Sequence, residues 1–107
     1  MNQKVTMKEI PSADRPYEKC LTQGARFLTD EELLAVIIRT GSKDATSLEL
    51  ARSILALEGH GTRLLGLLHH SLKDYCRIKG IGMVKGAQLM CIGELSRRIW
   101  NYKTKET

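Results

Sequence analysis

Aromatic residues and long apolar runs are both scarce in this sequence of 107 residues. Phe, Trp and Tyr together make up 5% of it, too few for a surface that stacks single-stranded bases. No apolar run approaches the ~20 residues that a membrane helix needs, and residues 1–6 lack the apolar centre of a signal peptide. The three cysteines form no CxxC pair and no even set. We therefore expect no membrane contact, and reduced thiols in a cytoplasmic protein.

Charge is unevenly distributed along the chain, whose net charge is +5. Residues 1–70 carry nine Lys/Arg and nine Asp/Glu, whereas residues 71–107 carry eight Lys/Arg and three Asp/Glu. The whole excess, eight minus three, lies in the second segment. A basic segment of this kind favours a polyanionic partner, although an ordinary solvated surface can have the same composition.

Helix signals recur along the chain. Thr29 with Glu32, and Thr46 with Glu49, match the capping box that begins a helix. The predicted helices cover about residues 16–23 (ended by Gly24), 30–40 (ended by Gly41), 47–58 (before Gly59), 63–68 (capped by Thr62), 72–77 (capped by Ser71) and 83–100. No segment shows strand alternation between turn residues. We therefore predict an all-α fold of five to six short helices.

The length and the 42% hydrophobic content predict one domain with a compact core. We place it at residues 1–100. Residues 101–107 have no apolar period, and we expect them to form a frayed tail or a linker. Gly86 and Gly93 lie seven residues apart on one side of the last helix. Glycine lowers helix stability, so close packing against another helix is the expected reason for both.

The most informative stretch is Ile78-Lys79-Gly80-Ile81-Gly82, between the last two predicted helices. Its glycines let the chain turn sharply and approach a ligand closely, and Ile81 is expected to point inward. Backbone N–H groups at the start of the following helix attract phosphate oxygens. The predicted phosphate contacts are Lys79, Gly80, Gly82, Val84, Lys85 and Gln88. A tight structural turn is the alternative explanation for a bare GxG.

This stretch resembles the helix-hairpin-helix motif of proteins that hold DNA by its backbone. Together with further blocks, it makes the chain similar to the N-terminal domain of the bacterial RadC family. The blocks are residues 14–19, 28–35, 38–41, 48–52, 71–72 and 78–95. They occur in the family's order, and the resemblance as a whole covers most of residues 6–100. One departure is Gly86, where the family often has Ala, which is expected to loosen the last helix and spare the hairpin.

The resemblance implies a helix-hairpin-helix domain like domain 2 of RuvA, with the motif at residues 71–99. It also implies a following JAB-type metal-dependent domain, in a family named for DNA repair. Helix-hairpin-helix proteins can hold a monovalent cation through backbone carbonyls, which here would be those of Cys76, Ile78 and Ile81. The resemblance implies no other cofactor for this chain.

We do not expect the catalytic half of such a protein in this chain. JAB-type catalysis needs a His-x-His pair, a later Asp, and a Glu that acts on metal-bound water. The chain has His60, His69 and His70, and no Asp after Asp74. Adjacent histidines on a helix point about 100° apart, so they make a poor metal-binding pair. We therefore predict neither a catalytic residue nor a metal ligand.

Two other catalytic readings are also weak. A helix-hairpin-helix DNA glycosylase needs an acid downstream of the hairpin, where only Glu94 lies, inside the last helix. Cys76 and Cys91 lack an obvious base partner, so we interpret them as small core residues.

The sequence therefore predicts an accessory domain that grips double-stranded or branched DNA without sequence specificity. The alternative is a module that binds a protein, such as the JAB-type domain, with the hairpin in a structural role. A degenerate second hairpin near Gly41 is a further expectation, weakened because residues 40–43 contain no second glycine.

Overall fold

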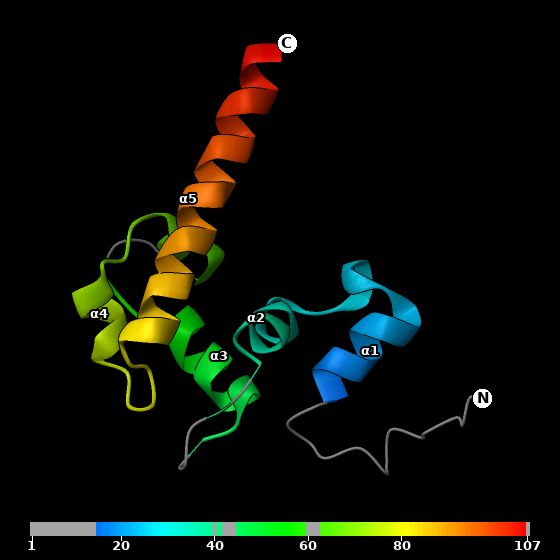
Figure 1. The fold of residues 1–107 in the computed structure, drawn as a ribbon, viewed down its shortest axis with the longest axis vertical. Coiled ribbons are helices and arrows are strands. Elements are labelled where there is room, and N and C mark those ends of the chain that lie inside the picture. The colour runs from blue at the N-terminus through cyan, green and yellow to red at the C-terminus, as the bar shows by residue number, and fades with distance from the viewer. Residues whose placement is uncertain (1–14, 40, 42–44, 60–62, 107) are drawn as a thin grey trace. The chain divides into compact units, whose positions relative to one another are not determined.

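The computed structural model describes residues 15–39, 41, 45–59 and 63–106, and every element in these ranges is a helix. The elements in chain order are α1 (Arg15–Gln23), η3 (Ala25–Phe27), α2 (Asp30–Ile38), α3 (Ser47–Ala56), η4 (Arg63–Leu68), α4 (Leu72–Cys76) and α5 (Met83–Glu106), as Figure 1 shows. The prediction of an all-α fold is confirmed. The chain divides into two compact units, residues 1–51 and 52–107, which we describe separately.

In the first unit, α1 packs against α2 and η3. Gly24 ends α1 as predicted: its φ is +99°, and its N–H donates to the Cys20 carbonyl at 2.9 Å. Lys19 joins α1 to α2, because its Nζ lies 3.0 Å from Glu32 Oε1. The predicted domain boundaries, including that at residue 100, stay a prediction.

Glu32 also closes the start of α2. Its Oε1 accepts from the Thr29 N–H at 2.9 Å, and its own N–H donates to Thr29 Oγ1 at 3.2 Å. The predicted capping box is therefore present. The hydrogen bond from the Thr29 N–H, with the Lys19 ammonium, lowers the pKa of Glu32 below its ordinary value, because both favour the ionised carboxylate.

The end of α2 differs from the prediction that Gly41 closes it. The helix ends at Ile38, and Arg39 takes a positive φ of 57° while its N–H still donates to the Ala35 carbonyl. The Arg39 guanidinium carbon lies 4.0 Å from the centroid of the Tyr17 ring. This cation–π contact favours a conformation that a non-glycine residue otherwise avoids.

The second capping box is also present, at the start of α3. The Thr46 N–H donates to Glu49 Oε1 at 2.8 Å, and the Glu49 N–H donates to Thr46 Oγ1 at 3.1 Å. The predicted helix cap at Thr62 lies outside the described residues. The segment that follows, η4, is a 3₁₀ helix.

In the second unit, α5 packs against α4 and η4, which Figure 1 shows beside its first turns. A Cβ on Gly86 would lie 2.6 Å from Leu72 Cδ1 of α4, and a Cβ on Gly93 would overlap the Leu67 carbonyl of η4. Both glycines are buried. The prediction that close helix packing explains them is confirmed.

The prediction that the last helix ends at Ile99 or Trp100 is wrong, because α5 continues to Glu106. Residues 101–106 contain neither Gly nor Pro, and extending an existing helix is far easier than starting one. The Thr104 hydroxyl donates to the Asn101 carbonyl at 3.0 Å. The absence of an apolar period thus did not prevent helix formation.

The prediction that Cys76 and Cys91 are core residues is also wrong. Both thiols are exposed and free of disulfide bonds. Cys76 ends α4, and Cys91 lies on the side of α5 away from its packed glycines. Residue type alone favoured burial, but helix orientation placed both cysteines at the surface.

Candidate nucleic-acid interface

The segment between α4 and α5 is a tight turn held by backbone hydrogen bonds. The Ile78 N–H donates to the Tyr75 carbonyl at 3.0 Å, and the Ile81 N–H donates to the Ile78 carbonyl at 3.0 Å. Gly80 lies between these residues with φ of +98°. Side chains avoid this conformation and glycine adopts it readily, so the turn depends on Gly80.

Ile81 anchors the turn to the interior of the second unit. Its side chain is only 4% exposed, which confirms that it points inward. Lys79 and Gly82, on either side of the glycine–isoleucine pair, are exposed. The turn therefore buries its apolar residue and presents its backbone and lysine to solvent.

The helix before the turn is fixed by a third capping box and a buried tyrosine. Asp74 Oδ2 accepts from the Ser71 N–H at 2.9 Å, and the Asp74 N–H donates to Ser71 Oγ at 3.1 Å. Tyr75 is 0% exposed, and its ring meets that of His70 edge-on, with centroids 5.6 Å apart. Burial, with the nearby Asp74 charge, raises the pKa of Tyr75 to about 12. The hydroxyl thus stays neutral at physiological pH.

Sequence reasoning missed the part that His70 plays in this support. Its Nδ1 lies 3.6 Å from Asp74 Oδ2, and the side chain is buried. The spacing of His70 and Asp74, one helical turn apart, was the available signal.

The start of α5 differs from those of α2, α3 and α4. Gly82 occupies its N-cap position and has no side chain to accept from the helix, and the first turn contains no acidic residue. The first backbone bond of the helix runs from the Gly86 N–H to the Gly82 carbonyl at 2.9 Å. By helix geometry, the N–H groups of Met83 and Val84 have no acceptor within the helix. A helix start without an acidic side chain favours an anion from outside.

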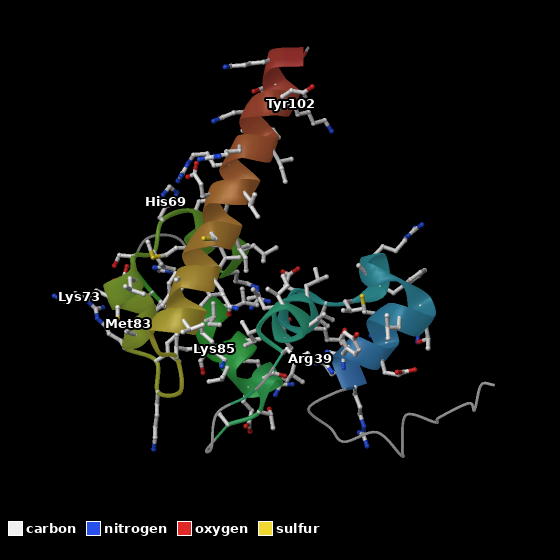
Figure 2. The ribbon with its side chains drawn as sticks, viewed as in Figure 1. Arg39, His69, Lys73, Met83, Lys85 and Tyr102 are labelled. Carbon is white, nitrogen blue, oxygen red and sulfur yellow. The ribbon has the colours of Figure 1, made fainter. Side chains whose placement is uncertain are left out.

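The structure brings most of the predicted phosphate contacts into one segment. Gly80 and Gly82 lie in the turn, and Val84 and Lys85 lie in the first turn of α5, where Figure 2 shows the Met83 and Lys85 side chains. Lys79 is exposed and Lys85 is half-buried. Gln88 is exposed one turn further along α5, where it lines an apolar groove. Whether these residues bind phosphate stays a prediction.

The carbonyls implied for a monovalent cation lie in the same turn. The Ile78 carbonyl accepts from the Ile81 N–H, which uses one of its two lone pairs and leaves the other available to an ion. This cation site stays a prediction. Within the described residues, no group of three or more His, Cys, Asp and Glu side chains is arranged to hold a metal ion.

A groove of about 600 Å³ lies along the exposed side of α5. Its lining is formed by Met83, Val84, Ala87, Cys91, Ile92 and Leu95, with Gln88 as the one polar side chain. Its lining residues run along α5 from Met83 to Leu95. Among the described helices, none is long and apolar enough to span a membrane.

A family model and individual related proteins both point to the same protein family. A sequence model of the family described as UPF0758 N-terminal matches residues 7–87. A UPF0758 protein of Alkaliphilus oremlandii is 39% identical over 107 residues, covering 94% of this chain and 45% of that protein. One of Clostridium perfringens is 42% identical over 98 residues, covering 92% of this chain and 42% of that protein.

A third relative, a UPF0758 protein of Albidiferax ferrireducens, is 42% identical over 107 residues, covering 94% of this chain and 46% of that protein. The chain thus spans less than half the length of these relatives. No solved structure matches it.

Proposed function

The chain belongs to the UPF0758 N-terminal family, and we propose that it binds double-stranded or branched DNA, without sequence specificity, through the turn between α4 and α5. UPF0758 is the RadC-family group of JAB-containing proteins. The resemblance to the RadC family is therefore confirmed. DNA binding is proposed for this chain from its own residues.

The observation that supports DNA binding best is the combination of an anchored turn with a helix start that has no acidic side chain. Ile81 fixes the turn, while Gly80 and Gly82 keep side chains away from its outer surface. A Cβ on Gly82 would meet no atom within 4 Å, so a phosphate oxygen can approach the backbone there. The N-terminal end of α5 adds a favourable partial positive charge.

Lysines supply the longer-range attraction. Lys79 and Lys85 flank the turn, within the segment that carries the whole net charge of +5. Contacts of this kind neutralise phosphates and release counterions, and they read no base sequence. Few phosphates are reached by one hairpin, so we expect a dissociation constant in the ~10⁻⁴–10⁻⁶ M range that rises steeply with salt.

The proposed role is accessory, because no catalytic residue is proposed for this chain. In the RadC-family group the protein also contains a JAB domain. DNA binding by this chain would then bring such a domain, a proposed partner, to nucleic acid. The proposed site of action is the cytoplasm.

A protein-binding module is the second candidate, and the apolar groove on α5 favours it. A groove with a single polar side chain is typical of a surface that another protein covers. The two functions respond oppositely to salt: phosphate binding weakens with added salt, whereas an apolar contact does not.

The test measures binding of labelled duplex and forked DNA at about 50 mM and about 200 mM salt. It compares the native chain with the Lys79→Glu/Lys85→Glu variant. We expect the native chain to bind more weakly at the higher salt and the double variant to lose binding at both. The matched control is Arg52→Glu/Lys73→Glu, which makes the same charge change at two other exposed positions. It should lose much less affinity if the turn is the contact.

Thermal unfolding of all three proteins checks that the folds are intact. Absence of binding by the native chain at ~1 mM, well above the expected range, would contradict DNA binding. Equal losses in the two double variants would instead show a general charge effect, with no special part for the turn.

A further inference from the structure

A row of apolar side chains runs along α5 on the side away from α4 and η4. It consists of Val84, Ala87, Cys91, Leu95, Ile99 and Tyr102, at intervals of three or four residues, and we call it the α5 stripe. At about 100° per residue, these positions lie roughly opposite the packed residues Gly86, Leu89 and Gly93. The helix therefore has two apolar sides, and α4 and η4 cover one of them.

The second half of α5 is exposed on all sides. Every residue from 94 to 105 is exposed, and Figure 1 shows this part of the helix, in orange and red, extending past α4 and η4. Leu95, Ile99 and Tyr102 are 61–67% exposed. A helical segment of about 12 residues is marginal in water by itself, and most helices in proteins are stabilised by packing of an apolar side. A row of large apolar side chains on such a segment indicates a surface that another part of a protein covers.

The relatives indicate which part of a protein this is. The matching family model describes an N-terminal region, and the matched part makes up less than half of each relative. More than half of each relative therefore follows that region. Since α5 is the last helix of the matched part, the remainder of a relative is attached close to the counterpart of the α5 stripe. Such an attachment gives an effective concentration of ~1 mM at the stripe.

We propose that the α5 stripe is the docking surface for the C-terminal part of a UPF0758 protein, which is the part that follows the N-terminal region. The proposal rests on the second candidate function, protein binding, and is independent of DNA binding. A tethered partner needs little affinity of its own. At an effective concentration of ~1 mM, a contact with a dissociation constant of ~0.1 mM is occupied about nine-tenths of the time.

The edges of the α5 stripe are basic, which favours this partner over a second copy of the chain. Lys103 and Lys105 are exposed and lie on opposite sides of Tyr102 by helix geometry. Lys85 gives the other end of α5 the same sign of charge. A second copy would therefore place cations beside cations in either orientation of the two helices. A partner surface that is apolar at its centre and acidic at its edge would be attracted.

Docking on the α5 stripe would divide the residues of the candidate nucleic-acid interface. Gln88 lines the groove of α5 together with residues of the stripe, so a docked part would cover its side chain and remove it from the phosphate contacts. Lys79 and Gly80 lie in the turn before α5, outside the stripe, and would stay accessible to DNA. One helix would then hold DNA at its start and the rest of the protein along its exposed side.

The test compares the reactivity of cysteines placed at two leucine positions, in this chain and in the full-length UPF0758 protein of Alkaliphilus oremlandii. The match to that protein covers 94% of this chain, so it includes the positions of Leu65 and Leu95. These leucines are 66% and 61% exposed here, and Leu65 lies in η4, off the stripe. Leu65→Cys, Leu95→Cys and the corresponding two variants of the relative are treated with a small thiol reagent, and peptide mapping gives the rate at each position. Thermal unfolding checks that each variant is folded.

We expect the two positions to react at similar rates in this chain. In the relative, the position of Leu95 should react about tenfold more slowly than that of Leu65, as nine-tenths occupancy requires. Equal rates at the two positions of the relative would overturn the proposal, and so would a slower reaction at the position of Leu65.

Protein concentration separates a tethered part from a second copy. The slower reaction at the position of Leu95 should be the same at about 1 μM and about 100 μM protein, because a tethered contact does not depend on concentration. Slowing that appears only at the higher concentration would show that a second copy covers the stripe, and it would overturn the proposal.

Two native cysteines allow a second measurement on this chain's own surface. Both are exposed; Cys91 lies on the α5 stripe, whereas Cys76 lies near Gly86, on the packed side of α5. In a fusion of this chain to the unmatched C-terminal part of the Alkaliphilus oremlandii protein, Cys91 should react about tenfold more slowly than in the chain alone. Cys76 should be unchanged.

A folded fusion in which Cys91 reacts as in the chain alone would overturn the proposal. If the added part does not fold in the fusion, the two variants of the native relative decide the outcome. Neither measurement contains DNA, so a failure of docking and a failure of DNA binding are observed separately.

Discussion

The connection from α2 to α3 contains Gly41, and the turn from α4 to α5 contains Gly80 and Gly82, but the helices that follow them begin differently. At α3, Thr46 and Glu49 exchange hydrogen bonds, so a carboxylate already occupies the helix start. At α5, Gly82 has no side chain and the first turn has no acid. One helix start thus contains a carboxylate that would repel an anion, and the other contains none.

The comparison shows how one fold can separate structural helix starts from a binding one. The starts of α2 and α4 follow α3, with capping boxes built by Glu32 and Asp74. Each carboxylate satisfies backbone N–H groups and would repel a phosphate. This arrangement argues against a second phosphate-binding hairpin near Gly41, a prediction that falls partly on residues 40 and 42–44, outside the described residues.

The largest expected effect concerns the anchor of the α4–α5 turn. Ile81→Ala should reduce the free energy of unfolding by about 2–4 kcal/mol, because it leaves a cavity at a buried site. Ile37→Ala, near the α2–α3 turn, should cost no more than about 0.5 kcal/mol, since Ile37 is 50% exposed. Urea unfolding of both variants measures the difference. Equal losses would show that Ile81 does not anchor its turn.

The second largest expected effect is the difference in stability between alanine substitutions at Gly41 and at Gly86. A Cβ on Gly41 would overlap the Ala45 carbonyl and lie within 2.9 Å of Ser47 N, so Gly41→Ala should destabilise the chain by about 1–3 kcal/mol. Gly86→Ala meets only the flexible end of Leu72 at 2.6 Å, and it gains up to ~1 kcal/mol of helix propensity. We expect Gly86→Ala to be close to neutral in thermal unfolding, because these two effects oppose each other. A larger loss for Gly86→Ala than for Gly41→Ala would contradict this ranking.

Closing the open helix start should have opposite effects on stability and binding. Gly82→Asp supplies an N-cap carboxylate and should stabilise the chain by about 0.5–1 kcal/mol, while it weakens DNA binding by repelling phosphate. Gly82→Ser is the uncharged control, with similar stability and a smaller loss of binding. Thermal unfolding and DNA titration of the same samples measure both quantities. Unchanged DNA affinity in Gly82→Asp would remove the α5 start from the contact.

The smallest expected effect is a loss of folding stability at low pH. The pKa of Glu32 is lowered in the folded chain, chiefly by the hydrogen bond from the Thr29 N–H. Its stabilising contribution is therefore present above the pKa of the unfolded chain and is lost as pH falls through the lower pKa of the folded chain. The α5 start has no carboxylate in its first turn and should contribute no such dependence. NMR titration of the Glu32 carboxyl should give a midpoint below that of the same carboxyl in the urea-unfolded chain. Equal midpoints would show that Glu32 contributes no such dependence.

Much of the local structure could be predicted because its causes are local. The capping boxes at Thr29 and Thr46 depend on residues three apart, and Gly24 ends α1 by its own positive φ. Prediction failed where a distant contact decided the outcome. Arg39 ends α2 beside the Tyr17 ring, which belongs to α1.

The features of the candidate site also have either local or distant causes. The helical character of the chain, the basic excess in residues 71–107 and the break between two helices at Gly80 and Gly82 can all be predicted from residue types and their order. These properties follow from composition and from neighbouring residues. Only the tertiary structure decided that α4 and η4 cover one side of α5 and leave Leu95 and Tyr102 on the other. A helix can be apolar on two sides, and packing against the rest of the chain selects which side is buried.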